Sequence, residues 1–450
     1  MTTGHVYETE SWMFHPLEKN ALRRYTLNMS ETVCLHNGTV LTGFAAMENC
    51  AVLMENGLIS DVFSQKRFEQ RRFNPKDRII DVGGAYIAPG FIDTHVHGTG
   101  GYGTEDSIFS GPDSGGAMYV ETDDRAAIEA GTQSVLEMSK LLAEQGVTAF
   151  NPTLYPSEPA LMLRAVKAVS SAIGKEEGAR IMGLHLEGPF ISPDKLGVQK
   201  ADAVMPVDTD FMEQLWVASG GSIVNMTIAP ELKGMRSLAL YCIKKGIVLQ
   251  AGHTDAKYEH MVEGMQAGIL HSTHLFNAMS RLDHRNPNAA GAVLIHGEMS
   301  CEIIADGFHV HPELLQLLMR DKPIDKIVLV TDGLKPTEQR EGPFFANGEE
   351  VVFRDGAFRR ASDGVIAGSG LTMIRGVRNL AKSGFSISNV VKTASFNPAH
   401  IMGYVMQGAI VPGRLADIAV FDKDFDIRLV MVGGKIMHGA CPEGENRCES

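Results

Sequence analysis

The stretch Ile87-Ala-Pro-Gly-Phe-Ile-Asp-Thr-His95-Val-His97-Gly98 is an apolar run that ends in two histidines one residue apart. In a β-strand, residues i and i+2 point to the same side, so we expect the imidazoles of His95 and His97 to face one point. Such a pair suits a metal ion. An isolated His-x-His pair is more often an ordinary part of a core or surface, so a metal site needs support from the rest of the chain.

The composition indicates a well-packed, acidic protein. The chain has 450 residues, of which 44% are hydrophobic and 21% charged, and its formal net charge is −13 at pH 7. This length allows one large domain with an attachment, or two to three ordinary domains. The acidic balance argues against nucleic acid or an anionic membrane as a partner, because either would favour a basic surface. We therefore expect an enzyme acting on a small molecule, or a scaffold.

Cysteine usage and hydropathy predict a cytoplasmic location. The 6 cysteines include no Cys-x-x-Cys pair, so the sequence indicates neither a zinc knuckle nor a disulfide framework. Scattered cysteines of this kind fit a reducing compartment. The sequence does not begin with a basic and then apolar segment, and no run approaches the roughly 18 apolar residues needed to span a bilayer.

The character of the sequence divides the chain into four parts. Residues 1–29 have no clear period and are expected to form an N-terminal extension. Short β-type runs broken by Asn-Gly turns fill residues 30–85, and a similar pattern returns in residues 406–450. We expect these two segments to form one small β-sandwich. Residues 86–405 are then the main domain.

Eight apolar runs alternate with amphipathic segments through most of the main domain. The predicted strands are 86–92, 147–150, 181–186, 222–228, 247–250, 270–273, 301–305 and 326–330. The predicted helices include 125–145, 160–173, 235–245, 258–267 and 313–320. This alternation predicts an α/β protein with a (β/α)8 TIM barrel. A doubly wound open sheet is less favoured, because no Gly-x-Gly-x-x-Gly turn follows an early strand.

Metal-ligating residue types follow the carboxyl ends of the predicted strands. They are His95, His97, Glu187, His253, His274, His309 and Asp332. In a barrel these strand ends converge on one mouth, where the catalytic residues of this fold lie. Any one of the residues alone is more often a hydrogen-bonded polar group, but seven at strand ends favour a common site.

The ligand types indicate hydrolytic metal chemistry. Imidazole and carboxylate suit Zn²⁺ best, with Fe²⁺ or Co²⁺ as alternatives. Glu187, His253 and His274 form one expected ligand set, and the earlier pair, His95 and His97, could complete a second metal position bridged by Glu187. The expected number of ions is therefore one or two for each subunit.

Asp332, in Val330-Thr-Asp-Gly333, is the expected general base and acid. Water on a metal ion has its pKa lowered toward about 7, which supplies a metal-bound hydroxide as nucleophile at neutral pH. Asp332 would take the proton from this water and pass it to the leaving group. The predicted reaction is hydrolysis of an amide or a related bond.

Several motifs resemble those of the amidohydrolase superfamily, namely Pro89-Gly-Phe-Ile-Asp-Thr-His-Val-His97, Asp332 and the closing Gly413-Arg-Leu-Ala-Asp-Ile-Ala-Val-Phe421. Finer motifs are similar to those of the N-acetylglucosamine-6-phosphate deacetylases: His185-Leu-Glu-Gly-Pro-Phe190, Ala251-Gly-His-Thr-Asp-Ala256, Thr273-His-Leu-Phe-Asn-Ala-Met279, Ile304-Ala-Asp-Gly-Phe-His-Val310 and Ala367-Gly-Ser-Gly-Leu-Thr-Met373. The resemblance runs from about residue 32 into the 430s. It implies a metal-dependent homodimer in amino-sugar catabolism that hydrolyses the acetamide of N-acetylglucosamine 6-phosphate to glucosamine 6-phosphate and acetate.

The same resemblance implies a set of substrate-binding residues. Asn277, Ala278, Arg285 and His309 are expected to contact the sugar phosphate and its ring. Gln199 stands where members of the family commonly have a histidine that helps to hold the acetyl carbonyl. Glutamine can donate a hydrogen bond there but cannot provide a charge, so a shift in substrate is an open alternative. The segment from Gly103 to about residue 120 looks longer than expected, and is either a lid or a surface insertion.

Two further alternatives remain at this point. Another amidohydrolase, acting on a different N-acyl sugar or a cyclic amide, would share His95, His97 and Asp332, although many cyclic-amide hydrolases use a carboxylated lysine where Glu187 is expected here. A non-catalytic scaffold built on the same barrel should have lost ligands, and this sequence retains all of them.

Overall fold

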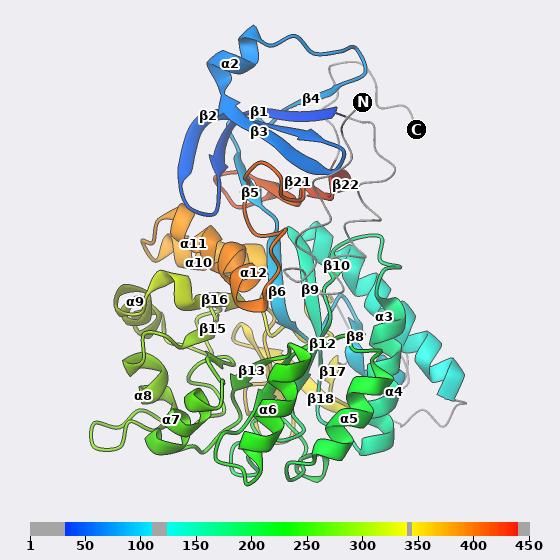
Figure 1. The fold of residues 1–450 in the computed structure, drawn as a ribbon, viewed down its shortest axis with the longest axis vertical. Helices are drawn as coiled ribbons and strands as arrows, with labels where there is room; N and C mark the ends of the chain where they lie inside the picture. Colours follow the sequence, from blue (N-terminus) through cyan, green and yellow to red (C-terminus); the bar gives the residue numbers. More distant parts are fainter. Residues whose placement is uncertain (1–31, 110–123, 340–343, 440–450) are drawn as a thin grey trace.

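The protein has two parts, a small β-sheet domain at one end and a larger barrel with its helices (Figure 1). The structure, a computed structural model, describes residues 32–109, 124–339 and 344–439. The expected N-terminal extension over residues 1–29 lies outside these described residues, as does the part of the expected lid from residue 110 onward.

Eight parallel strands form the barrel, each paired with its neighbours in chain order. They are β6 (Phe91–Val96), β9 (Val147–Leu154), β11 (Leu184–Glu187), β12 (Ile223–Ile228), β13 (Val248–Ala251), β14 (His271–Ser272), β15 (Ser300–Ile304) and β16 (Ile327–Val330). A short strand, β10 (Arg180–Ile181), precedes β11 and also pairs with β9. A parallel bridge between Val96 and Gly333 closes the barrel between its last and first strands. The predicted (β/α)8 barrel is confirmed.

Helices cover the outside of the barrel. They are α3 (Asp124–Glu144), α4 (Pro159–Ala172), α5 (Thr209–Ala218), α6 (Met235–Lys245), α7 (Tyr258–Gln266), α8 (Asn288–Ile295), α9 (Pro312–Asp321), α10 (Met373–Lys382), α11 (Ile387–Ala394) and α12 (Phe396–Met402). In α3 the buried residues recur at helical spacing, as in Val135, Met138 and Leu142, so one face packs on the strands. The five helices expected from periodicity are all present.

The small sheet is built from both ends of the described chain, with the strand order β22-β21-β20-β5-β1-β2-β3 and β4 beside β1. The strands are β1 (Thr32–Leu41), β2 (Ala46–Glu55), β3 (Leu58–Ser64), β4 (Arg78–Asp81), β5 (Tyr86–Pro89), β20 (Ile418–Phe421), β21 (Ile427–Val432) and β22 (Lys435–His438). The first half of β1 pairs with β4 and its second half with β5. Asn37, with φ of 59°, lies between these two halves, where the ladder is irregular. A six-residue helix, α2 (Gln65–Gln70), follows β3.

One predicted barrel strand, 86–92, was wrong in its extent, because the chain divides at Gly90. The residues before it form β5 of the small sheet, and those after it begin β6 of the barrel. Glycine is required here, because a Cβ atom at this position would lie 2.1 Å from the side chain of Thr148. A buried ion pair also joins the two domains, with Arg180 Nη1 2.7 Å from Asp417 Oδ2.

Two smaller sheets lie after barrel strands. β7 (Gly98–Thr99) and β8 (Tyr102–Gly103) follow β6, and β17 (Phe344–Ala346), β18 (Glu349–Arg354) and β19 (Ala357–Arg360) follow β16. The expected surface insertion after Gly103 begins instead as a buried 3-10 turn, η1 (Thr104–Ser107). Asp106 in this turn accepts hydrogen bonds from Lys335 and Ser134 at 2.5 Å each, which fixes its place beside the barrel. Two further 3-10 turns are η2 (Ala201–Ala203) and η3 (Ile324–Lys326).

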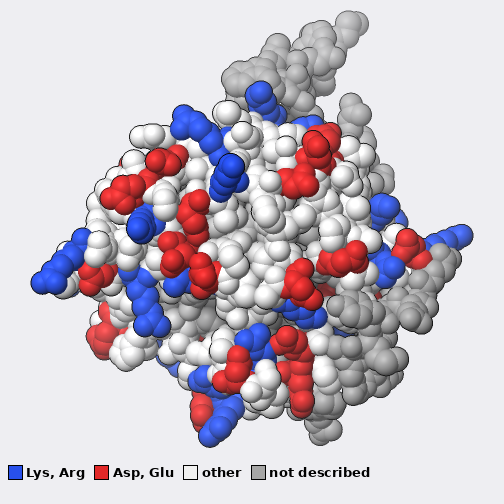
Figure 2. Space-filling model, turned by 90° about the horizontal axis from the view of Figure 1, so that it is seen from below, with Lys and Arg blue, Asp and Glu red and all other residues white. Residues whose placement is uncertain are grey.

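The end of the molecule away from the small sheet has an uncharged middle, with basic and acidic side chains interspersed around it (Figure 2). Because β6 starts next to β5 of the small sheet, the carboxyl ends of the barrel strands face this end. A long basic stripe, as expected for a nucleic-acid surface, is not seen on the part of this face that the structure describes. Among the described residues, the helices are too short or too polar to cross a membrane.

Candidate active site

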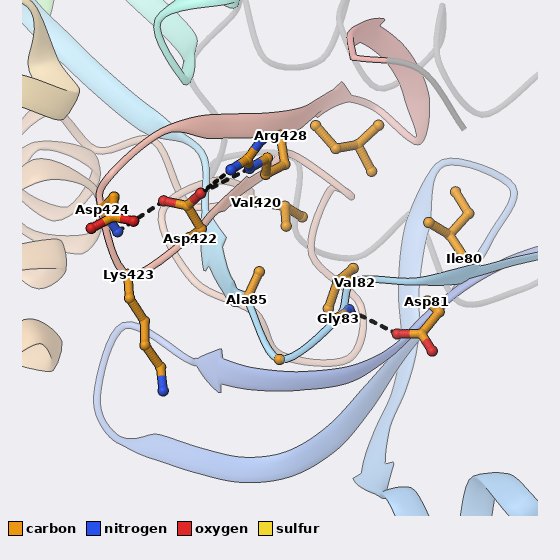
Figure 3. A pocket seen from close by; sticks show the side chains of 12 residues that line it. Ile80, Asp81, Val82, Gly83, Ala85, Val420, Asp422, Lys423, Asp424 and Arg428 are labelled. Carbon is orange, nitrogen blue, oxygen red and sulfur yellow. Dashed lines mark hydrogen bonds and ion pairs between the residues drawn. The ribbon is translucent and has the colours of Figure 1, made fainter. Parts of the chain in front are cut away.

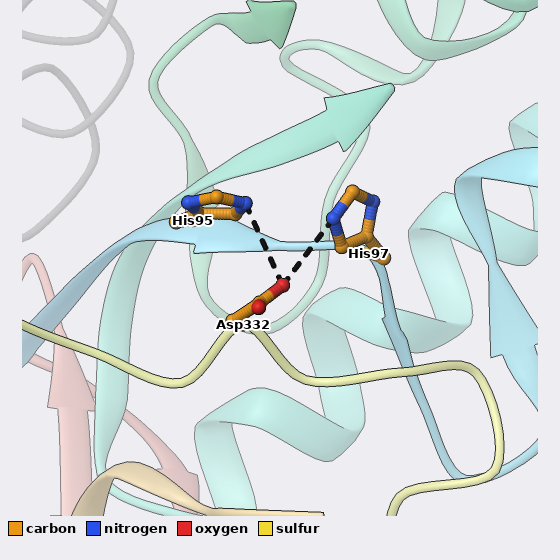
Figure 4. Close-up of side chains that lie close together, drawn as sticks. All are labelled: His95, His97 and Asp332. Carbon is orange, nitrogen blue, oxygen red and sulfur yellow. Dashed lines mark ion pairs between the residues drawn. The ribbon is translucent and has the colours of Figure 1, made fainter. Parts of the chain in front are cut away.

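Two groups of buried metal-ligating side chains face each other at the carboxyl ends of the barrel strands. One group is His95, His97 and Asp332, and the other is Glu187, His253 and His274. In the first group, Asp332 Oδ1 lies 3.6 Å from His95 Nε2 and 3.4 Å from His97 Nε2 (Figure 4). In the second, Glu187 Oε1 lies 3.0 Å from the Nε2 atoms of both His253 and His274.

Glu187 links the two groups through its two carboxylate oxygens. Its Oε1 lies 3.5 Å from His95 Nε2, and its Oε2 lies 3.4 Å from His97 Nε2. Burial would raise the pKa of Glu187, but His253 and the neighbouring histidines outweigh burial and hold this pKa well below its usual value. The side chain is therefore a carboxylate with an oxygen near each group, in the arrangement expected of a bridging ligand.

The outer nitrogens of three of the four histidines are held by acceptors behind the site. His95 Nδ1 is 2.9 Å from Glu302 Oε2, His97 Nδ1 is 3.1 Å from the carbonyl of Thr153, and His253 Nδ1 is 3.0 Å from the carbonyl of Lys195. A carbonyl or carboxylate can only accept, so each Nδ1 bears a proton, and in the neutral ring that binds a metal each Nε2 then presents a lone pair to the site. Metal-binding histidines in proteins are commonly held in this way.

The unpaired atoms at the centre also fit a metal ion. His95 Nε2 is buried without a hydrogen-bond partner among the described residues, although an unpaired buried nitrogen is costly. The Nε2 atoms of His253 and His274 face each other at 3.2 Å, which brings two lone pairs together if both rings have the tautomer that a metal requires. A divalent cation in each group would give these nitrogen atoms a partner.

Strained backbone positions hold several of these residues at the strand ends. His253 has φ of 45°, Asp332 of 49° and Ala278 of 47°, values that residues other than glycine rarely adopt. Such strain costs on the order of 1–3 kcal/mol for each residue and tends to occur at functional sites. The hydrogen bond from Asp332 N to the carbonyl of His95, at 2.9 Å, shows that the barrel closure itself places this aspartate.

The pKa of Asp332 fits a base that is ionised at neutral pH. Burial alone would raise this pKa, but His95 and His97 outweigh burial and lower it. Asp332 is 7% exposed and lines a cavity, so its carboxylate can reach a bound molecule. The ligand sets and Asp332 together can activate water against a carbonyl and transfer its proton.

A cavity of about 290 Å³ contains most of the residues that the sequence singled out. Those lining it are His97, Glu187, Gln199, His253, His274, Asn277, Ala278, His309 and Asp332. His95 lies beneath them and is fully buried. Arg285 is exposed on the loop before α8 and is outside the lining of this cavity.

Gln199 and His309 have defined partners in this cavity. Gln199 Nε2 donates to Glu187 Oε2 at 2.5 Å, so the glutamine contacts the bridging carboxylate directly. His309 Nδ1 is 2.7 Å from Asp306 Oδ2, which turns its Nε2 toward the cavity. In the sequence, Asp306 is three residues before His309, a spacing that could have indicated this pairing.

Several lining residues were not expected from the sequence. Tyr155 stacks on the ring of His97 with the two centroids 3.8 Å apart, and Leu334, Val365 and Ile366 add an apolar side to the cavity. Glu302 behind His95 was also missed, because its strand was interpreted only as an apolar run. A charged residue in the middle of such a run was the available signal.

A larger hollow of about 580 Å³ lies on the small sheet, where Asp81, Asp422, Asp424, Lys423 and Arg428 are among its lining residues (Figure 3). Three of its charged side chains have local partners: Asp422 pairs with Arg428 and accepts the backbone N–H of Asp424, and Asp81 accepts the N–H of Gly83. Metal-ligating sets were found only in the barrel among the described residues. The barrel cavity is therefore the candidate active site.

This barrel and its facing ligand sets define a metal-dependent hydrolase of the amidohydrolase type. The model of the amidohydrolase family matches residues 86–437, and the chain belongs to this family. N-acetylglucosamine-6-phosphate deacetylase from Bacillus subtilis (strain 168) is 30% identical over 415 residues, covering 91% of this chain and 98% of that protein. N-acetylgalactosamine-6-phosphate deacetylase from Shewanella sp. (strain ANA-3) is also 30% identical, over 89% of this chain and 95% of that protein.

A solved structure shows the same fold. The crystal structure of N-acetylglucosamine-6-phosphate deacetylase from Pasteurella multocida superposes with a TM-score of 0.79 and 25% identity, covering 90% of this chain and 99% of that chain. The resemblance to deacetylases of this kind, expected from the sequence motifs, is confirmed.

Proposed function

We propose that this protein hydrolyses the acetamide of N-acetylglucosamine 6-phosphate to glucosamine 6-phosphate and acetate in amino-sugar catabolism. The observation that supports this most directly is the position of Asp332, Glu187 and the paired histidines at the base of one cavity. The motifs and relatives that resemble deacetylases supply the substrate class. The protein acts as an enzyme, since a scaffold would have no need of six buried, converging ligands.

The amidohydrolase family is metal-dependent, and we propose Zn²⁺, with Fe²⁺ or Co²⁺ as alternatives, at one or two positions in each subunit. The residues that would hold the metal are Glu187, His253 and His274, and then His95 and His97 with Glu187 or Asp332. Four imidazoles and two carboxylates form a mixed nitrogen and oxygen set that suits these ions. Such an ion, when bound, lowers the pKa of water and polarises a carbonyl.

Asp332 is the proposed proton carrier. Its Oδ1 takes a proton from the attacking water and later gives it to the amine nitrogen as the bond between carbon and nitrogen breaks. This role needs a carboxylate that is ionised at neutral pH yet close to the reacting atoms, and its lowered pKa and place in the cavity fit both needs. Gln199 holds the bridging carboxylate of Glu187 and adjoins the space for the acetyl group.

The sugar is proposed to occupy the outer part of the cavity. His309, with its Nδ1 fixed by Asp306, offers Nε2 to a ring hydroxyl, and Asn277 and Ala278 border the same space. Among the described residues, those that line the cavity include neither lysine nor arginine. The phosphate therefore needs a cation from elsewhere, and we propose that Arg285, exposed on its loop, reaches it in the neighbouring subunit of a homodimer. A cytoplasmic location remains a prediction from the cysteine usage.

A second candidate is the epimeric substrate, N-acetylgalactosamine 6-phosphate. The relative from Shewanella, whose name carries that substrate, is as similar in percentage identity as the relative from Bacillus. The two sugars differ only in the orientation of one ring hydroxyl, so the apolar side formed by Val365 and Ile366 could decide between them. Another N-acyl sugar or a cyclic amide is the remaining alternative.

Acetate release from a set of four compounds tests this proposal. The set is N-acetylglucosamine 6-phosphate, N-acetylgalactosamine 6-phosphate, N-acetylglucosamine and a cyclic amide, each with the zinc-loaded protein. We expect the highest kcat/KM for N-acetylglucosamine 6-phosphate and loss of this activity on removal of the metal by a chelator. A higher kcat/KM for the galactosamine epimer would assign the second candidate. Ring opening of the cyclic amide without acetate release would refute both.

A further inference from the structure

A continuous line of buried polar side chains runs through the barrel interior to His95. Tyr404 donates from its hydroxyl to Asn151 Oδ1 at 2.9 Å, and Asn151 Nδ2 donates to Asn225 Oδ1 at 3.1 Å. Asn225 Nδ2 donates to Gln250 Oε1 at 2.9 Å, and Gln250 Nε2 donates to Glu302 Oε1 at 2.6 Å. Glu302 Oε2 is the acceptor of His95 Nδ1. Every member of the line is at most 2% exposed: Tyr404, Asn151, Asn225, Gln250, Glu302 and His95.

The direction of every hydrogen bond in this line is determined by its ends. Glu302 is a carboxylate that only accepts, so the NH2 group of Gln250 must face it and the oxygen of Gln250 must face Asn225. The same reasoning sets the orientations of Asn225 and Asn151, and the hydroxyl of Tyr404 supplies the last donor. A reversed amide at any position would bring two donors or two acceptors together in a buried place, which is costly.

At the His95 end of the line, these hydrogen bonds fix the tautomer of the His95 ring. With Nδ1 protonated toward Glu302, the Nε2 atom presents its lone pair to the space shared with His97 and Asp332. Of the three histidines whose outer nitrogen is held, His95 is the one held by a carboxylate, while backbone carbonyls hold the other two. A fixed hydrogen-bond acceptor behind an imidazole sets its tautomer and makes it a stronger ligand, and loss of such support typically lowers metal affinity about 10–100-fold.

We propose that Glu302, aligned by Gln250, is the positioning residue that makes His95, His97 and Asp332 a second metal position. Loss of this support empties that position and leaves Glu187, His253 and His274 able to hold one ion. The inference rests on the proposed metal-dependent function, but it concerns how many ions the chain holds and which residues decide this.

Complementary substitutions can test the line. Both oxygens of Glu302 accept hydrogen bonds, one from His95 Nδ1 and one from Gln250 Nε2. In Glu302→Gln one oxygen becomes an NH2 group, so a donor faces one of these two donors and that hydrogen bond is lost. Gln250→Glu alone places two carboxylates against each other. The double variant, Glu302→Gln with Gln250→Glu, restores every hydrogen bond: the new amide gives its oxygen to His95 and its NH2 group to the new carboxylate, which accepts from Asn225.

Zinc content for each subunit is measured by elemental analysis after loading with Zn²⁺ and dialysis. We expect two ions in the natural protein, about one in each single variant and a return toward two in the double variant. Gln250→Met, which removes the donor without adding charge, should weaken one of the two ions about 10-fold or more in competition with a chelator. This milder variant keeps the test decisive if Glu302→Gln fails to fold.

Asn397→Ala is the matched control, because Asn397 is a fully buried amide with two hydrogen bonds of 2.7 Å that lies outside the line. It should lower thermal stability and leave zinc content at two. One ion in the natural protein, or two in folded Glu302→Gln, would overturn the inference, as would a double variant no better than either single one. Acetate release is measured separately, so two zinc ions without deacetylation would refute the proposed function alone.

Discussion

Glu105 is a buried carboxyl group whose ionisation is expected to oppose folding near neutral pH. Its side chain lies in η1 beside the active site, is 4% exposed, and has one oxygen, Oε2, without a hydrogen-bond partner among the described residues. Burial raises the pKa of Glu105 to about 7, an effect that Lys335 offsets only in part. The pKa of the same group in the unfolded chain is close to 4.5.

The sign and size of the effect follow from these two values. The unfolded chain releases the proton of Glu105 first, as the pH rises through 4.5, while the folded protein retains it until about pH 7. The stability that the folded protein has with Glu105 protonated is therefore fully present below pH 4.5. This stability is lost as the pH rises to about 7. A difference of about 2.5 pH units, at 1.36 kcal/mol for each unit, corresponds to a loss of about 3 kcal/mol in the free energy of unfolding.

Glu105→Gln removes this titration while keeping the shape of the side chain. Urea titrations of the metal-loaded protein at pH 5 and pH 8 would give the free energy of unfolding for the natural protein and the variant. Between these pH values we expect the natural protein to lose about 2–3 kcal/mol more than Glu105→Gln. Glu129→Gln, which alters an exposed glutamate paired with Arg125, is the control and should follow the natural protein. Parallel pH profiles for Glu105→Gln and the natural protein would refute the reasoning.

Three further predictions concern the active site. Asp332→Asn should lower kcat by a factor on the order of 10²–10⁴ with metal retained, because an amide oxygen can remain near the metal but cannot take a proton, and a near-normal kcat would exclude Asp332 as the base. Glu187→Ala should lose bound metal and activity together, and full occupancy by elemental analysis would place the site elsewhere. Arg285→Ala should lower kcat/KM for N-acetylglucosamine 6-phosphate by about 2–3 kcal/mol while barely changing slow turnover of the unphosphorylated sugar. Arg281→Ala, on the same exposed loop, is the matched control, and equal losses on both sugars for Arg285→Ala would indicate a structural role.

The fold was predictable where the evidence is local to each segment. Apolar runs of strand length, separated by amphipathic helices, predicted seven barrel strands closely and the first only in part. Polar residues after six of these runs indicated where the functional groups would converge. The division at Gly90 was not predictable in this way, because β5 joins the small sheet through its pairing with β1 on one side and with β20, more than 300 residues later, on the other. Pairing over such a distance leaves no mark in the local sequence pattern.

The candidate site shows the same limit. The metal-ligating residues follow the ends of barrel strands, so their position in the sequence predicts that they face the barrel mouth. The groups that hold them in place belong to segments that the sequence pattern does not connect with the site. Glu302 lies within a strand, Lys195 contributes a backbone carbonyl, and Val365 and Ile366 reach the cavity from beyond a three-stranded insertion. These contacts depend on how separate elements pack, so residue types and spacing alone do not reveal them.

The two kinds of residue around the cavity also differ in what holds them, and this predicts where substrate choice can change. The metal-ligating residues emerge from barrel strands and are fixed by buried partners or strained backbone, so substitutions that shift them should damage metal binding before they alter selectivity. Asn277 and Val365 belong to connecting segments at the cavity rim, which have fewer such constraints. A change from one amino-sugar epimer to the other is therefore expected to map to residues 277–285 and 365–368, with the zinc content of the protein unchanged. An epimer switch produced only by changes at His95, Glu187 or Glu302 would contradict this division between chemistry and selectivity.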